Sequence, residues 1–212
     1  MIYLVNGSER SVYPSLVDEM HRLRAKVFSE RLGWEVEVKN GREVDRFDDC
    51  SPLYLISVNE STGRVEGSLR LLQTLGPNML RDVFPSLLGP DEFIESPTIW
   101  ESSRFSIDPD LPHERSAKRL SRVTTELLCG IVEVGLLAGL SHIVSVFDAR
   151  MVRIFRSANC PADLIGKPAR IGKVTAYAGL FEISREMRER IGTAGMQTEP
   201  VLRSASQLSL AA

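Results

Sequence analysis

The spacing of hydrophobic residues changes along the 212-residue chain and predicts strands and helices in turn. Short apolar runs, or apolar and polar residues in alternation, predict strands at 1–5, 53–59, 65–72, 99–107, 142–147 and within 174–183. Apolar residues at steps of three and four predict helices at 16–27, 115–139 and 150–158, with a further short helix within 77–88. The strands at 53–59 and 65–72 are joined by Glu60-Ser-Thr-Gly63, which is typical of a hairpin. Strands alternate with helices around this antiparallel pair, so we expect an α/β fold with a mixed sheet covered by helices.

The length suits a single domain, which we expect to span residues 1–192. Residues 193–212 are small and polar and predict a flexible C-terminal tail. No repeat, no glycine-rich dinucleotide motif and no phosphate-binding loop motif is present.

Composition narrows the function classes. The chain is 43% hydrophobic and 25% charged with a net charge of −2, so neither a disordered protein nor a dedicated nucleic-acid binder is expected. Three cysteines and three histidines are scattered, which argues against a metal site or disulfides. We see no secretory signal and no apolar stretch long enough to span a membrane, and we therefore expect a cytoplasmic protein.

Residues 29–50 hold seven acids and four bases together with Trp34 and Phe47, which predicts a long functional or mobile loop. A solvated acidic loop is one interpretation. The other is a pocket for a sulfonium or ammonium group, with aromatic walls at Trp34 and Phe28 and a counter-ion at Asp45 or Asp48. Arg24 lies one helical turn before Phe28, and its simpler interpretation is a structural salt bridge to an acid in this loop.

Glu101 and Arg104 are three residues apart on a predicted strand, so regular pleating would place them on opposite faces. If both serve one site, a β-bulge must lie between them, and it would also free backbone groups to bind a ligand. Alternatively the two residues flank an edge strand. Further along the chain, a basic region that includes Arg150, Arg153 and Arg156 suits docking of an acidic partner, although a solvated helix face is the usual fate of such residues.

Together these motifs resemble the acyl-homoserine-lactone synthases, the autoinducer synthases of quorum sensing. The resemblance runs from about residue 3 to about residue 183 and includes the flanking text ESSRF at 101–105. No departure is seen at the eight positions that define the family, which are Arg24, Phe28, Trp34, Asp45, Asp48, Arg70, Glu101 and Arg104.

The resemblance implies an N-acetyltransferase-like three-layer sandwich with a V-shaped central sheet and a bulged central strand. It implies two substrates, S-adenosylmethionine and an acyl chain on acyl carrier protein, with no separate cofactor. Glu101 would deprotonate the amine and Arg104 would pair with the methionine carboxylate. The S-adenosylmethionine pocket and its lid would be formed by Arg24, Phe28, Trp34, Asp45 and Asp48, with Arg70 locking the acidic loop through ion pairs.

For the acyl chain, the positions that the resemblance and the pattern together indicate are Met79, Ser103, Phe105 and Ser145. A Ser145 hydroxyl could bond a 3-oxo group or simply pack within a strand. Arg150, Arg153 and Arg156 match the region that meets the acidic helix of the carrier protein. The stretch before Lys118 lacks a glycine-rich pyrophosphate loop, which favours a carrier-protein donor over coenzyme A. The alternatives are an N-acyltransferase acting on another amine, an acyl-coenzyme A donor, and a non-catalytic module that binds S-adenosylmethionine or a lipid.

Overall fold

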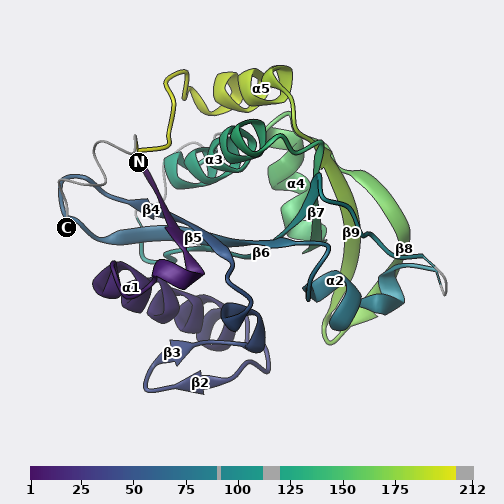
Figure 1. Cartoon of the computed structure of the whole chain (residues 1–212), viewed down its shortest axis with the longest axis horizontal. Helices are drawn as coiled ribbons and strands as arrows, with labels where there is room; N and C mark the ends of the chain where they lie inside the picture. Colours follow the sequence, from purple (N-terminus) through teal and green to yellow (C-terminus); the bar gives the residue numbers. More distant parts are fainter. Residues whose placement is uncertain (90–91, 112–119, 204–212) are drawn as a thin grey trace.

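The computed structural model describes residues 1–89, 92–111 and 120–203. Its centre is a seven-stranded mixed sheet in the order β1-β4-β5-β6-β7-β9-β8 (Figure 1). The strands are β1 (Ile2–Asn6), β4 (Leu53–Val58), β5 (Val65–Gln73), β6 (Ile99–Ile107), β7 (His142–Asp148), β8 (Asp163–Ile171) and β9 (Val174–Glu182). Neighbouring strands are antiparallel except for the parallel pair β6 and β7. The expected mixed α/β sheet is therefore confirmed.

Helices cover both faces of this sheet (Figure 1). One face carries α1 (Pro14–Arg24), the π-helical turn η2 (Ala25–Arg31) and a small hairpin of β2 (Val38–Lys39) and β3 (Arg42–Glu43). The other carries α3 (Arg122–Ala138), α4 (Ala149–Ser157) and α5 (Arg185–Gly195), which share the largest hydrophobic core. The remaining short elements are η1 (Gly7–Glu9), η3 (Arg46–Asp49), α2 (Met79–Asp82) and η4 (Pro85–Leu87). These layers form the three-layer sandwich that the resemblance implied.

The sheet opens into a V between β6 and β7. Their ladder runs only from Ile99 opposite His142 to Ser102 opposite Ser145, although both strands continue beyond it. On its other side β6 bulges: Ser68 and Arg70 of β5 face Ser106 and Ser103, so β6 has one extra residue there. Within this bulge Arg104 has a positive φ of 55°. The bulge inferred from the spacing of Glu101 and Arg104 is present, and the edge-strand alternative is wrong because β6 is a central strand.

Helix α3 packs closely on the sheet because β5 has a glycine beneath it. A Cβ on Gly67 would lie 2.5 Å from Val123 Cγ1, so a larger residue would push the helix away. The helix begins after the N-cap Ser121 and ends at Gly139, whose left-handed φ of 67° suits a C-cap. The predicted helix began at residue 115; residues 112–119 lie outside the described part of the chain, and the described helix begins at Arg122.

Three other expectations need correction. Strand β8 was not predicted, because this edge strand is largely exposed and lacks alternating hydrophobic residues. Helix α5 was not predicted either, and the described chain continues beyond it: Val201 is buried and its carbonyl accepts the Ile2 N–H at 2.8 Å. The tail predicted from residue 193 therefore packs as far as Arg203, and residues 204–212 lie outside the description. Residues 77–88 form α2 and η4 rather than one helix.

Residues 29–50 also differ from the predicted mobile loop. They hold the β2–β3 hairpin and η3, and Glu43, Phe47 and Asp48 within them are buried. The solvated-loop interpretation is wrong for these residues. In the described parts of the chain, no helix has the length and apolar character needed to cross a membrane.

Candidate active site

Three arginines and three carboxylates come together between the sheet and the α1 layer. Arg24 comes from the end of α1, Arg70 from β5 and Arg104 from the bulge of β6. The carboxylates follow one another along the segment that contains β3 and η3: Glu43, Asp45 and Asp48. We call these six residues the ionic network. Its formal charges cancel, which is what allows so many ionised groups to be buried together.

Asp48 accepts more hydrogen bonds than the other carboxylates of the network. Its Oδ1 accepts from Arg24 Nη1 at 2.8 Å, from Arg70 Nη1 at 2.9 Å and from Tyr54 OH at 2.8 Å. Its Oδ2 accepts from Arg24 Nη2 at 3.0 Å and from the Asp45 N–H at 2.8 Å. Burial by itself would raise the pKa of Asp48, but the hydrogen bonds and charge of Arg24 outweigh it and lower that pKa far below its ordinary value. Asp48 is therefore ionised and structural, and the simpler interpretation of Arg24 is confirmed.

Asp45 links the network to its more exposed end. Its side chain is 17% exposed, accepts a hydrogen bond from Arg70 Nη1 at 2.6 Å and forms an ion pair with Arg104 Nη2 at 2.6 Å. Its Oδ1 also accepts the Phe47 N–H at 2.9 Å, so Asp45 and Asp48 form a capping box that begins η3. Arg70 thus does lock the acidic segment through ion pairs, as the resemblance implied.

Glu43, which was not among the predicted site residues, is fully buried and joins two arginines. Its Oε2 accepts from Arg24 Nε at 2.5 Å, and its Oε1 accepts from Arg104 Nε at 3.0 Å. Its backbone carbonyl lies 2.9 Å from His21 Nδ1, which must carry the proton because a carbonyl can only accept. A usable signal existed: Glu43 and Asp45 are two apart in an extended segment, and such residues point to the same side.

An aromatic wall lies beside the network. Phe28 is buried within η2, and the Trp34 ring stacks on it with centroids 5.2 Å apart. The backbone holds the two together, because the Trp34 N–H donates to the Phe28 carbonyl at 2.9 Å. The Arg104 guanidinium lies 5.4 Å from the centroid of the Phe28 ring, and Trp34 is 41% exposed. The wall therefore joins the network at Arg104, and Trp34 is its solvent-exposed part.

Glu101 is buried on β6 and faces the start of α2. Its two carboxylate oxygens accept the Met79 N–H at 2.8 Å and the Leu80 N–H at 2.6 Å. Burial raises the pKa of Glu101, although these two backbone donors partly offset the effect. Each oxygen has a second lone pair that these bonds do not use, so the carboxylate can still accept a proton or a further hydrogen bond.

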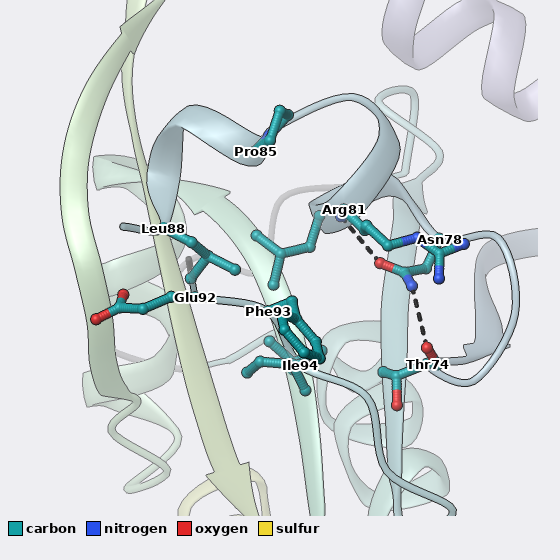
Figure 2. A pocket seen from close by; sticks show the side chains of 10 residues that line it. Thr74, Asn78, Arg81, Pro85, Leu88, Glu92, Phe93 and Ile94 are labelled. Atoms are coloured by element: carbon teal, nitrogen blue, oxygen red, sulfur yellow. Dashed lines mark hydrogen bonds between the residues drawn. The ribbon is translucent and has the colours of Figure 1, made fainter. Parts of the chain in front are cut away.

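The turn before α2 is fixed by Asn78. Its side-chain oxygen accepts the Arg81 N–H at 3.0 Å, and its amide donates to the Thr74 carbonyl at 3.4 Å (Figure 2). Behind α2 lies a cavity of about 50 Å³, with the side chains of Leu88, Phe93 and others around it (Figure 2). That volume has room for only a few water molecules and is too small for an acyl chain.

The expected acyl-chain residues divide into two groups. Met79 and Ser103 contact the ionic network: Met79 Sδ lies 3.4 Å from both Arg70 and Arg104, and Ser103 Oγ accepts from Arg70 Nε at 3.2 Å. Phe105 instead packs against the core beneath α3. The Ser145 hydroxyl donates to the Ser102 carbonyl at 2.8 Å, at the last paired position before the V opens.

On α4, three exposed side chains at spacings of three residues form what we call the α4 arginines: Arg150, Arg153 and Arg156. Helix α4, which carries them, lies on the opposite side of the sheet from α1 (Figure 1). The structure therefore places α4 across the sheet from the layer that holds the ionic network, whereas Ser145 lies on the strand directly before α4.

Several known proteins resemble this chain in sequence and in fold. The acyl-homoserine-lactone synthase of Agrobacterium fabrum is 37% identical over 199 residues, covering 94% of each chain. Among solved structures, the synthase LasI is 31% identical with a TM-score of 0.77, over 90% of this chain and 93% of that one. BjaI, described as a CoA-dependent acyl-homoserine lactone synthase and solved with SAM and isopentyl-CoA, is 25% identical with a TM-score of 0.82, over 96% and 92%.

The similarity in sequence and in fold shows the class of protein: it is an acyltransferase with an N-acetyltransferase-like fold. The sequence profile of the autoinducer synthases matches residues 8–191. The chain belongs to the autoinducer synthase family, and it has the acyl-homoserine-lactone synthase function in that broad sense.

Proposed function

We propose that the protein transfers an acyl group from acyl carrier protein to the amine of S-adenosylmethionine and then closes the lactone, releasing methylthioadenosine as it makes a quorum-sensing signal. S-adenosylmethionine is a substrate in this scheme, and no cofactor is needed. The observation that carries the proposal is the juxtaposition of the ionic network with the aromatic wall at Arg104. A ligand with a carboxylate, an amine and a sulfonium fits charges of both signs beside an exposed indole.

In the first step the free amine attacks the thioester carbonyl, the C–N bond forms, and the carrier thiol leaves with a proton. The amine must first lose its own proton. Glu101 is the proposed base, directly or through a water, and its raised pKa moves it toward the range in which a carboxylate serves as one. Backbone N–H groups at the β6 bulge, in 103–105, are the proposed donors to the oxyanion.

In the second step the methionine carboxylate attacks its own γ-carbon. The bond from that carbon to the sulfonium sulfur breaks, and neutral methylthioadenosine leaves with the electron pair. Because this reaction is intramolecular, it needs positioning more than acid or base groups. Arg104 is the proposed partner of the carboxylate. It is the most exposed arginine of the network, at 10%, so it can exchange a protein carboxylate for that of the ligand.

The proposed acyl donor is acyl carrier protein rather than coenzyme A. The exposed α4 arginines offer positive charge to an acidic carrier protein, whereas the described relative BjaI uses coenzyme A. A coenzyme A donor is therefore the competing candidate, and BjaI is the specific observation in its favour.

The test is to incubate the purified protein with S-adenosylmethionine and either octanoyl-carrier protein or octanoyl-coenzyme A, and to quantify products by mass spectrometry. We expect lactone and methylthioadenosine in equal amounts, with the carrier protein as the better donor. Amide without methylthioadenosine would instead indicate an N-acyltransferase of another amine, and binding without turnover would indicate a non-catalytic module. Glu101→Ala and Arg104→Ala should abolish both products, whereas Glu60→Gln, in the exposed turn after β4, should not.

A further inference from the structure

A lysine outside the ionic network joins the element that carries Phe28 of the aromatic wall to the end of the strand that carries Arg104. Lys26 lies in η2, two residues after Arg24 and two before Phe28. Its Nζ donates to Asp108 Oδ1 at 2.6 Å and to Asp110 Oδ2 at 2.7 Å. Asp108 follows directly on β6, the strand that holds Glu101 and Arg104. The contact thus joins positions 82 residues apart in sequence.

The aspartate end of this contact is anchored. The Asp108 N–H donates to the Glu66 carbonyl at 2.9 Å, which extends the pairing of β5 with β6. Asp108 Oδ1 also accepts the Asp110 N–H at 3.1 Å, so the two carboxylates are held in one turn. The Asp108 side chain is only 11% exposed, whereas that of Asp110 is 78% exposed. Asp108 is therefore the buried, fixed partner of Lys26, and Asp110 is a second partner that is exposed to solvent.

The lysine end lies on an element that needs support. A π-helical turn is rare, usually a single turn and often found at functional sites. Here it sets the position of Phe28, whose ring contacts both Trp34 and the Arg104 guanidinium. A shift of η2 away from β6 would separate the aromatic wall from Arg104 without breaking the buried pair of Arg24 with Asp48.

We infer that Lys26 is a positioning residue for the S-adenosylmethionine site: through Asp108 and Asp110 it holds η2, and with it the Phe28–Trp34 wall, at a fixed distance from the β6 bulge. The inference rests on the proposed function for the identity of the ligand. The pKa of Lys26 is raised by its hydrogen bonds to the two aspartates, in keeping with a charged lysine at neutral pH.

The test compares Lys26→Met and Lys26→Arg with Arg22→Met as a matched control. Arg22 lies one helical turn earlier and pairs with Asp18 on its own helix at 2.8 Å, so its loss removes an ion pair without releasing η2. We expect Lys26→Met to raise the Kd for S-adenosylmethionine and the KM about five-fold, the upper effect of a partly exposed ion pair, with kcat nearly unchanged. Lys26→Arg should restore most of the affinity, Asp108→Asn should resemble Lys26→Met, and the double variant should be no worse than either alone.

Affinity measured by calorimetry needs no acyl donor, so a wrong donor assignment does not affect it. If the parent protein binds S-adenosylmethionine and Lys26→Met binds it equally well while only its Tm falls, the contact is merely structural and the inference is overturned.

If the parent protein does not bind that ligand, the proposed function fails, and a ligand-free measurement decides the inference. The chain has two tryptophans, so Trp100→Phe leaves Trp34 as the only one. Acrylamide quenching of Trp34 in that background should increase on Lys26→Met and be unaffected by Arg22→Met; equal quenching in all three proteins would overturn the inference.

Discussion

Replacing Asp48 by asparagine should destabilise the protein far more than the same change at its neighbour Asp49. Asp48 accepts five hydrogen bonds, and four of them come from arginine or backbone N–H groups, which can only donate; the fifth comes from the Tyr54 hydroxyl. An asparagine amide would place N–H groups against one set of these donors. It would also leave the ionic network with one uncompensated positive charge.

Breaking a buried ion pair costs about 3–5 kcal/mol. We expect the lower end, about 3 kcal/mol, because Arg24 keeps Glu43 at 2.5 Å and Arg70 keeps Asp45 at 2.6 Å. For a chain of this length that corresponds to a fall in Tm of about 6–12 °C. Asp49 is the control: its side chain is 76% exposed and pairs with Arg10 at 3.2 Å, so Asp49→Asn should cost less than about 1 kcal/mol.

The penalty should depend on pH in a defined direction. Despite burial, arginines lower the pKa of Asp48 and of Asp45 in the folded protein. A carboxyl whose pKa is lower when folded contributes stability that is present above its unfolded pKa of about 4 and is lost as the pH falls below that value. The difference between parent and Asp48→Asn should therefore be full at neutral pH and shrink in urea titrations at about pH 3. A cost below about 1 kcal/mol at neutral pH, or one equal at both pH values, would refute the reasoning.

We expect further measurable effects at Glu101, at Ser145 and at the α4 arginines. Glu101→Gln should lower kcat by about 100-fold or more with little change in the Kd for S-adenosylmethionine, measured by product formation and calorimetry; an unchanged kcat would remove Glu101 as the base. Ser145→Ala should lower the free energy of unfolding by about 1–3 kcal/mol, since the Ser102 carbonyl loses its donor, and should leave the ratio of 3-oxo to unsubstituted lactone unchanged. A selective loss of 3-oxo product would show that the hydroxyl serves the substrate instead. Replacing the α4 arginines by glutamate should raise the KM for acyl-carrier protein, more so at low salt, and leave the KM for S-adenosylmethionine unchanged; equal KM values for the carrier protein would exclude this docking face.

Local patterns predicted much of the fold because most buried elements carry them. The stripe on α3 and the apolar runs of β4 and β5 follow directly from periodicity. The bulge was also predictable, since Glu101 and Arg104 could share a face only with an extra residue between them. Edge strand β8 gave no such pattern, because exposed residues dominate it. Helix α5 gave only a short one, since Met187 and Ile191 are its two large apolar side chains that are buried.

The site was harder to predict, because its key groups are buried charges whose partners are distant in sequence. Glu43 appeared as one acid among seven in a segment that composition alone would place in solvent. Its partner Arg104 lies 61 residues away, and no local spacing relates the two. The role of Ser145 was ambiguous for the same reason: the carbonyl that accepts its hydrogen bond is that of Ser102 on β6, 43 residues earlier.

Exposure within the ionic network is graded, and the gradient suits a ligand that carries both signs of charge. Arg24, Arg70, Glu43 and Asp48 are at most 1% exposed and hold one another in place. Arg104 and Asp45 are 10% and 17% exposed and pair at the open end. For the proposed substrate, a carboxylate can replace Asp45 at Arg104 while an amine or sulfonium replaces Arg104 at Asp45. Such an exchange keeps every buried charge paired, so binding does not incur the large cost of desolvating an isolated ion. A cluster of side chains with only one sign of charge would attract one end of that ligand and repel the other. The equal number of positive and negative groups therefore matters more for binding than how many charged groups there are.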